Sequence, residues 1–378
     1  MPLPVYLLAL AVFAMGTSEF MLAGLLPDLA ADLGVSVATA GLLTTAFAAG
    51  MVVGAPLTAA LARRRPPRAT LLAFLGLFLA AHVIGAVTDH FAVLLATRVV
   101  AALANAGFLA VALTAAAALV APDRKGRALA VLLGGTTIAT IAGVPGGALL
   151  GALLDWRATF WAVALLCVPA ALGLLRGLPD TRETHGLRTE LAALRRPRLL
   201  LVMGLGALVN AATFGAFTYI APVVTETAGL GALWVPVVLV LFGAGSFTGV
   251  TVAGRLSDHR PGRVVAVAGP LLLLGWCALG LLAAHPAALL ALAFTQGALA
   301  FAVGSTLIAR VLHEAADAPT MAGSYATAAL NVGAAAGPVL AAFALGVGPA
   351  GPLWAAAVLV AAALLIAVPG RRVFTVLR

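Results

Sequence analysis

Two very long stretches of the sequence, residues 264–309 and 318–370, contain no Asp, Glu, Lys or Arg. A transmembrane helix crosses a hydrocarbon core ~30 Å thick in about 20 apolar residues, so each stretch is long enough for two crossings. Five further uncharged stretches lie at residues 33–62, 99–122, 128–154, 199–225 and 227–254. Water-soluble domains carry roughly 25% charged residues, whereas this chain carries 9%. The sequence therefore excludes a water-soluble globule and predicts a polytopic membrane protein.

Turn residues divide the apolar sequence into twelve predicted helices. They are expected near residues 4–26, 36–61, 69–88, 91–113, 126–150, 157–176, 199–223, 232–256, 263–284, 287–310, 319–346 and 352–369. The first helix has no basic residue in front of Leu3 and contains an acid, so we expect it to remain as a span and not to be cleaved as a signal peptide. The predicted fold class is an all-α membrane protein with twelve transmembrane helices.

The basic residues mark one side of the membrane. Of 22 Lys and Arg residues, only Arg98 and Arg157 fall outside the even-numbered loops and the C-terminal tail. Short cytoplasmic loops carry an excess of Lys and Arg, so both termini are expected to be cytoplasmic. The net charge of +9 is then a topology signal, and we expect a lipid bilayer around the helices and no nucleic-acid partner.

A polar segment divides the chain almost in half. Residues 179–198 are predicted as a cytoplasmic linker between two six-helix bundles, 1–178 and 199–378. Similar features recur at a nearly constant offset: Pro27 and Pro222, and Gly54 and Gly249, are 195 positions apart, and Gly143 and Gly337 are 194 apart. Such parallel repeats are typical of transporters whose pseudo-symmetric halves rock about a site near the membrane midplane.

One acid, Glu19, lies well inside a predicted span. An intramembrane carboxylate is costly and indicates a proton relay, an ion site or a ligand contact. The alternative is a glutamate that is bonded to a neighbouring helix or stays wet near the interface.

One basic residue, Arg98, lies inside a span, at the same predicted depth as Glu19, ~10 Å below the outer face. If their helices are neighbours, the guanidinium favours the ionised Glu19, and separation of the pair favours the protonated form. The pair is therefore a candidate proton-coupling site, with a permanent ion pair that fixes helix register as the alternative.

The polar side chains of the spans cluster on a few helices and indicate a mildly polar cavity. Binding pockets are mostly apolar with a few polar contacts, so this composition suits an uncharged or weakly charged amphiphile. Each polar residue alone could instead join two helices. The candidate substrate contacts are Asn105, Asn210, Phe214, Phe217, Tyr219, Gln296, Tyr325 and Asn331.

Two predicted helices carry Gly/Pro faces, at residues 143–151 and 331–338. Small residues four apart let helices approach closely, and proline bends a helix. Equivalent faces in the two halves suit surfaces that pack in one state and part in another, although small-residue packing is common in any Ala- and Gly-rich membrane protein.

Several kinds of chemistry have no residues to support them. Cys167 and Cys277 are the only cysteines, which leaves no disulfide framework or zinc cluster. The sequence has no phosphate-binding loop and no Gly-x-Ser-x-Gly motif, so it does not predict ATP hydrolysis or an esterase-type enzyme. We expect no metal and no cofactor, and transport would draw on an ion gradient.

The whole chain resembles the drug:proton antiporters of the major facilitator superfamily, and most narrowly the chloramphenicol-resistance exporters of actinobacteria. The resemblance rests on the sequence at residues 16–28, on the Ala40–Phe47 stretch, on Gly54-Ala-Pro56-Leu, on Gly143-Val-Pro145-Gly-Gly and on Trp156-Arg157-Ala-Thr-Phe160. Sugar and nucleoside exporters share much of this pattern. The resemblance implies that Gly143, Pro145, Gly146 and Gly147 occupy the antiporter motif associated with export.

The same resemblance assigns two further motifs. Arg98 matches the family's arginine in the fourth helix, although Ala101-Ala102 replaces the expected Gln-Gly. The cytoplasmic gate motif is kept in the second half as Gly254, Asp258 and Arg263, whereas the first half has no Asp at the matching place.

These features predict a monomeric exporter in the cytoplasmic membrane that exchanges a hydrophobic antibiotic, most simply chloramphenicol, for protons by alternating access. Two alternatives stay open: a proton-coupled exporter of a sugar, nucleoside or other metabolite, and a membrane sensor or scaffold that transports nothing.

Overall fold

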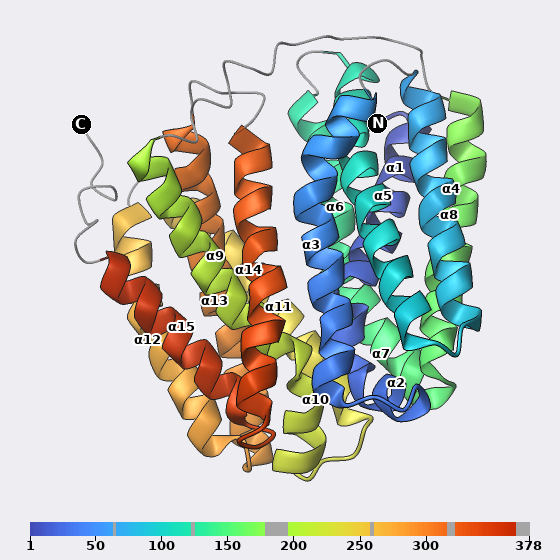
Figure 1. The fold of residues 1–378 in the computed structure, drawn as a ribbon. Helices are drawn as coiled ribbons and strands as arrows, with labels where there is room; N and C mark the ends of the chain where they lie inside the picture. Colours follow the sequence, from blue (N-terminus) through green and yellow to red (C-terminus); the bar gives the residue numbers. More distant parts are fainter. Residues whose placement is uncertain (63–65, 122–124, 178–195, 258–260, 316–321, 368–378) are drawn as a thin grey trace. The chain divides into compact units, whose positions relative to one another are not determined.

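The computed structural model describes the chain except for residues 63–65, 122–124, 178–195, 258–260, 316–321 and 368–378. The regular secondary structure of the described residues is helical throughout (Figure 1). Contacts divide the chain into two compact units, Met1–His185 and Gly186–Arg378. Because the predicted linker, 179–198, lies mostly outside the described residues, the predicted domain limits stay a prediction.

The described residues of the first unit form eight α-helices. They are α1 (Leu3–Phe20), α2 (Leu26–Asp32), α3 (Val37–Ala62), α4 (Pro67–Val87), α5 (Phe91–Ala118), α6 (Lys125–Ile138), α7 (Val144–Leu153) and α8 (Trp156–Gly177). Helix α1 packs against α5, α6 and α8.

The second unit contains seven α-helices within the described residues. They are α9 (Pro197–Thr218), α10 (Ile220–Pro222), α11 (Trp234–Ser257), α12 (Pro261–Leu282), α13 (Pro286–Glu314), α14 (Ala322–Leu345) and α15 (Gly351–Ala367). Helix α9 packs against α13, α14 and α15.

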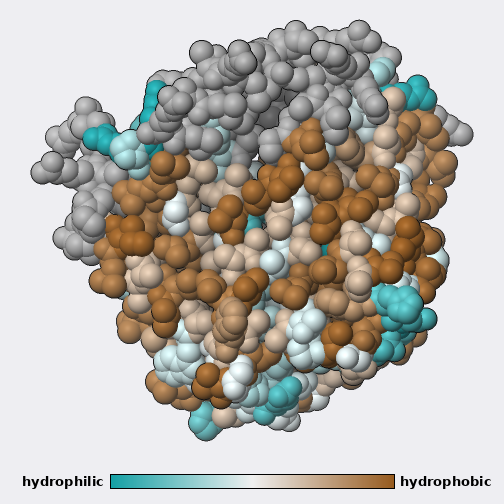
Figure 2. Space-filling model, viewed as in Figure 1, coloured by the Kyte–Doolittle hydropathy of each residue, from teal (hydrophilic) through white to brown (hydrophobic). Residues whose placement is uncertain are grey.

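In the described part of the chain, eleven helical segments are long and apolar enough to cross a membrane, and α15 is a shorter apolar helix. Together they occupy the twelve predicted positions. Large apolar side chains, such as Leu165 at 66% and Leu281 at 71% exposure, project from the helices instead of being buried. Figure 2 shows this apolar surface over the sides of the helices, with hydrophilic surface near the end of the first unit where α4 leads into α5. Helices that are apolar on every side are expected in lipid.

Three helices that were predicted to be continuous are interrupted in the structure, so this part of the prediction was wrong. The helix predicted at 4–26 ends at Phe20, continues as a 3₁₀ turn over Met21–Gly24 and resumes as α2. A π-turn at Ala139–Gly143 interrupts the helix predicted at 126–150, and the helix predicted at 199–223 ends at Thr218. A proline lies close to each break, at Pro27, Pro145 and Pro222. Proline removes a backbone donor and favours such local changes of winding.

The predicted repeat has a counterpart in helix packing. A Cβ atom added to Gly54 would lie 3.2 Å from Leu103 Cα, and one added to Gly249 would lie 2.9 Å from Ala298 Cα. The two glycines are 195 positions apart, and so are their two partners. Both units therefore use glycine at equivalent places to bring equivalent helices together, α3 to α5 and α11 to α13.

Candidate functional site

The buried guanidinium of Arg98, on α5, is bound to the last turn of α1. Arg98 Nη2 donates to the Ser18 carbonyl at 2.7 Å, and Nη1 donates to Ser18 Oγ at 2.8 Å. Carbonyl groups in the last turn of a helix lack helical partners, and α1 gives way to the 3₁₀ turn just beyond Ser18. The end of α1 therefore leaves the Ser18 carbonyl available to accept a hydrogen bond from Arg98.

The surroundings of Arg98 hold it in place. Its side chain is 1% exposed, and its guanidinium carbon lies 4.4 Å from the centre of the Phe47 ring on α3. Cation–π contacts of this kind contribute about 2 kcal/mol when they are desolvated. Arg98 Nε is buried and has no hydrogen-bond partner among the described residues. One donor of the guanidinium is thus unused in this arrangement.

Glu19 directly follows the serine that binds Arg98. The Arg98 charge acts on its carboxyl group, and the Asn105 side chain forms a hydrogen bond with it. Asn105 is 6% exposed, whereas Glu19 is only partly buried. The helices of the two residues, α1 and α5, are neighbours in the structure, as the predicted coupling requires. The Arg98 hydrogen bonds go to Ser18, which the sequence did not suggest.

A second residue that sequence reasoning missed is His82, on α4. Its Nε2 lies 2.7 Å from Ser18 Oγ, and its Nδ1 lies 2.8 Å from the Phe78 carbonyl oxygen. The side chain is 1% exposed and its ring lies 4.2 Å from that of Phe78 and 5.8 Å from that of Phe160. A histidine within an uncharged span was the available signal in the sequence.

The predicted antiporter motif packs against α1 close to Glu19. A Cβ atom on Gly143 would collide with Thr17 Oγ1, and one on Gly147 would lie 2.9 Å from Thr159 Cγ2 and 3.6 Å from Met21 Cβ. Pro145 is buried beside them. Gly146 differs, since no described heavy atom lies within 4 Å of its Cβ position.

The second unit repeats this contact. A Cβ atom on Gly337, in α14, would collide with the Ala211 carbonyl oxygen of α9. Gly337 is 194 positions after Gly143, and Ala211 is 194 positions after Thr17. The two predicted Gly/Pro faces thus contact equivalent helices of their own units.

Two of the predicted substrate contacts, Phe217 and Gln296, line one small cavity inside the second unit. Phe242 and Trp276, which the sequence analysis did not select, line it as well, and its volume is about 20 Å³. Gln296 Nε2 donates to the Leu272 carbonyl oxygen at 3.2 Å. Gln296 Oε1 and Trp276 Nε1 are buried and have no hydrogen-bond partner among the described residues.

Aromatic rings extend from this cavity. The Phe217 ring lies 5.2 Å from that of Phe242 and 6.3 Å from that of Phe214, and the Phe242 ring lies 6.2 Å from that of Phe301. The cavity therefore has largely aromatic and aliphatic walls, and two of the side chains that line it, Gln296 and Trp276, each hold a buried polar atom without a partner among the described residues.

Most of the other predicted contacts in the second unit bond to helix backbone. Asn210 Nδ2 donates to the Leu330 carbonyl at 2.7 Å, and Tyr219 Oη donates to the Pro338 carbonyl at 3.3 Å, which joins α9 to α14. Asn331 Nδ2 donates to a carbonyl of its own helix at 3.0 Å. Tyr325 is buried in α14. Asn105 belongs to the first unit, where its side chain forms a hydrogen bond with Glu19.

The predicted gate motif is only partly described. Gly254 lies in the last turn of α11 and Arg263 is exposed in the first turn of α12. Asp258 lies outside the described residues, so the gate stays a prediction.

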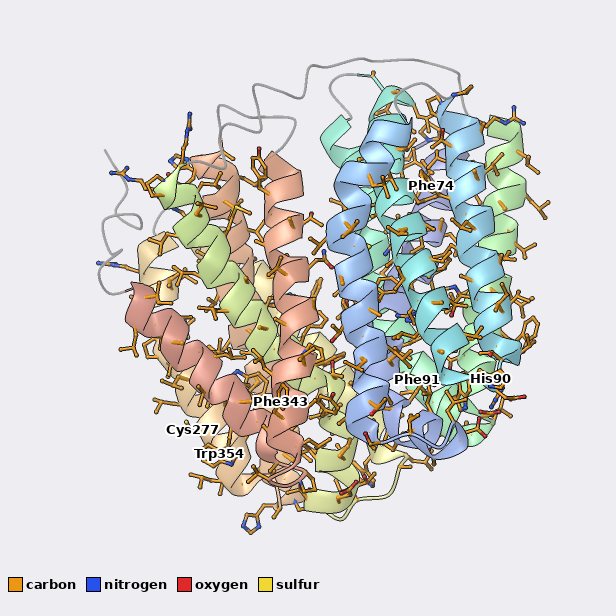
Figure 3. The ribbon with its side chains drawn as sticks, in the orientation of Figure 1. Phe74, His90, Phe91, Cys277, Phe343 and Trp354 are labelled. Atoms are coloured by element: carbon orange, nitrogen blue, oxygen red, sulfur yellow. The ribbon has the colours of Figure 1, made fainter. Side chains whose placement is uncertain are left out.

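Arg157, the other basic residue outside the Arg-rich loops, is surrounded by acids. Its guanidinium bonds to Asp32 and, at 2.7 Å, to Asp89, and it lies 3.7 Å from Asp155. The hydrogen bond from Arg157 lowers the pKa of Asp32 below its ordinary value of 3.8. Figure 3 shows the neighbouring His90 and Phe91 at this end of the first unit. The cluster ties together the chain segments around α2, α4 and α8.

Comparison with known proteins identifies the family. The sequence family described as the Major Facilitator Superfamily matches residues 8–328. A protein of Streptomyces lividans named "Chloramphenicol resistance protein" is 70% identical, with 99% of this chain and 98% of that protein aligned. The inner membrane transport protein YdhP of Escherichia coli K12 is 32% identical over 88% of this chain and 86% of its own length.

A solved structure has the same fold. It is the crystal structure of a bacterial homologue of the human lysosomal transporter Spinster, with a TM-score of 0.73 and 15% sequence identity over 99% of this chain and 98% of that one. Together with the apolar helices, these matches indicate a multi-pass inner-membrane transporter and not an enzyme. The chain belongs to the major facilitator superfamily.

Proposed function

We propose that this transporter exports a hydrophobic antibiotic, most simply chloramphenicol, in exchange for protons. The observation that carries the proposal is the carboxyl group of Glu19, within a membrane span and within reach of the buried Arg98 charge. The substrate follows from the 70% identical relative, which is named for chloramphenicol resistance. Acids within membrane spans mark proton and ion pathways.

Glu19 is the proposed proton carrier and Arg98 its counter-charge. Asn105 and Arg98 favour the ionised carboxylate, and any movement that withdraws the carboxyl group from them favours proton uptake. The change from α-helix to 3₁₀ turn begins at the residue after Phe20. A small backbone adjustment there would turn Glu19 towards or away from a guanidinium that Ser18 and Phe47 hold fixed.

The antiporter motif would connect this proton site to alternating access. Gly143 contacts Thr17, two residues before Glu19. A change in the packing of this helix pair would therefore move the end of α1. The cytoplasmic location of both termini, supported by the distribution of Arg and Lys, belongs to the same proposal.

The cavity of the second unit is the proposed contact for part of the substrate. Chloramphenicol is neutral, with one aromatic ring and with hydroxyl and amide groups. Trp276 Nε1 can donate to such a group, and Gln296 Oε1 can accept from one. A cavity of about 20 Å³ fits a single small substituent, so the rest of the molecule would lie outside it. The contacts predicted for Asn105, Asn210, Phe214, Tyr219, Tyr325 and Asn331 remain proposals.

Accumulation of labelled chloramphenicol in cells tests the function. Cells with the wild-type protein should hold less drug than control cells, and an uncoupler should abolish the difference. Glu19→Gln should accumulate drug as control cells do. Glu226→Gln, which removes an exposed acid after α10, is the matched control and should export normally. Equal accumulation with and without the wild-type protein would contradict drug export and favour the metabolite or sensor alternatives.

A further inference from the structure

The buried polar atoms around Arg98 form one connected chain of hydrogen bonds from α5 through α1 to α4. Arg98 Nη1 bonds to Ser18 Oγ at 2.8 Å, Ser18 Oγ lies 2.7 Å from His82 Nε2, and His82 Nδ1 lies 2.8 Å from the Phe78 carbonyl oxygen. Ser18 is 0% exposed, and Arg98 and His82 are each 1% exposed.

The chemistry of the two ends fixes where each hydrogen lies. The Phe78 carbonyl can only accept, so His82 Nδ1 carries a hydrogen. Arg98 can only donate, so Ser18 Oγ accepts from it. In a neutral His82 ring, Nε2 is then the unprotonated nitrogen, and the Ser18 hydroxyl hydrogen points to it. A neutral imidazole satisfies every group in the chain, whereas a second proton on His82 would force the Ser18 hydroxyl hydrogen to turn away from His82 and would place a second positive charge beside Arg98.

The charged and titratable groups around this chain are few in the described part of the first unit. Arg98 faces it from α5 and Glu19 adjoins it on α1. The neighbours of His82 on α4 and α8 are the rings of Phe78 and Phe160, and Phe47 from α3 lies against Arg98. These rings neither titrate nor offer a strong acceptor.

We propose that His82 and Ser18 are positioning residues that hold the Arg98 guanidinium on Ser18 and thereby keep it from bonding directly to the Glu19 carboxylate. Removal of the His82 acceptor frees the Ser18 hydroxyl to rotate and weakens its bond to Arg98. Arg98 Nε already lacks a partner among the described residues, and the Glu19 carboxylate, on which the Arg98 charge acts, is an acceptor that could take these donors. His82 thus sets how readily Glu19 accepts a proton, without carrying the proton itself.

Transport assays over a range of pH test this proposal, which rests on the proposed function. His82→Phe keeps the ring contacts with Phe78 and Phe160 but removes the acceptor, and Ser18→Ala removes the hydroxyl. Each should shift the half-maximal pH of transport about one unit lower. The double variant should shift it no further, because both changes break the same chain. His82→Gln keeps an acceptor and should restore most of the wild-type profile, and His285→Gln, at an exposed histidine, should match the wild type.

Two transport outcomes would overturn the proposal. One is an unchanged pH profile in folded His82→Phe and Ser18→Ala proteins. The other is a drop from two protons per substrate to one in His82→Phe, which would make His82 a proton carrier.

Nitrogen NMR of histidine-labelled protein tests the same inference without a transport assay. Its result therefore does not depend on whether the proposed function is correct. The His82 signal is assigned as the one that disappears in His82→Gln. Its shift should be that of a neutral ring with hydrogen on Nδ1, and it should stay unchanged between pH 5 and 8. It should move in Ser18→Ala. A hydrogen on Nε2, or titration in this range, would overturn the proposal.

Discussion

Arg98 donates two hydrogen bonds to Ser18, to its hydroxyl at 2.8 Å and to its carbonyl at 2.7 Å, and so ties α5 to the residue just before Glu19. Two hydrogen bonds from different nitrogens together with the contact over the Phe47 ring suit a guanidinium, and lysine offers only a point charge. We expect Arg98→Lys to fold but to lose at least tenfold in efflux rate. Efflux with near wild-type rate in Arg98→Lys would show that the charge alone suffices.

The antiporter motif offers a matched pair of glycines. Gly143→Ala places a methyl group against Thr17 Oγ1, while Gly146→Ala enters open space. Overpacking costs about 1–3 kcal/mol, so Gly143→Ala should lower the melting temperature and efflux together, and Gly146→Ala should change stability by less than about 0.5 kcal/mol. Thermal unfolding of the purified variants checks both.

A second substitution sharpens this test. Thr17→Ala removes the atom that the new methyl group would meet and should recover part of the loss in Gly143→Ala. If Gly146→Ala is as damaging as Gly143→Ala, contact with α1 is not the reason for the motif.

The Arg157 cluster should make stability depend on pH. The pKa of Asp32 is lowered in the folded state, so its contribution is fully present above its ordinary value of 3.8 and is lost as the pH falls through the folded-state pKa. The Asp32 side chain is 45% exposed, so the contribution should be about 0.5 kcal/mol. Asp32→Asn should lower the melting temperature by about 1–2 °C at pH 7 and by less at pH 3. An equal difference at both pH values would contradict the ion-pair account.

A substitution in the cavity of the second unit should change the affinity for drug more than it changes the stability of the protein. Trp276→Phe removes a buried donor that has no partner among the described residues, which offsets part of the packing lost with the smaller ring, so the free energy of unfolding should fall by no more than about 1 kcal/mol. If the substrate uses this donor, the KM for drug should rise about tenfold. An unchanged KM would remove the cavity from the substrate site.

One embedded acid predicts one proton per neutral drug molecule. A membrane potential of ~150 mV supplies about 3.5 kcal/mol per proton, which sustains a drug gradient of roughly 300-fold. Exchange should be electrogenic, and its reversal potential gives the stoichiometry. Two protons per drug molecule would require a second carrier.

The number and place of the membrane helices followed from the sequence because a run of uncharged residues has few alternatives in lipid. Glu19 and Arg98 could be selected together because each is unusual for its span and both lie at one depth. The interruption of α1 after Phe20 was not predicted. It depends on the backbone donor that Pro27 lacks and on the packing of the neighbouring helices, and the sequence does not specify this packing.

The partners of the buried polar groups were the hardest part to predict. Asn210 and Tyr219 each bond to the backbone of α14, while Gln296 Oε1 is left without a hydrogen-bond partner among the described residues. Which of these outcomes a residue meets depends on helix rotation and on the distance between helices. A single sequence specifies neither, and for the same reason the link from Ser18 to His82 became visible only in the structure.

The central claim is that Glu19 carries the proton that drives drug export. Inside-out vesicles with an acidic lumen and a pH-sensitive dye test it most directly. Chloramphenicol should release protons from vesicles with the wild-type protein and with Glu226→Gln, but not from vesicles with Glu19→Gln. Equal proton release with Glu19→Gln would contradict the claim. Proton release only with a sugar or nucleoside would show that the substrate is a metabolite and not the drug.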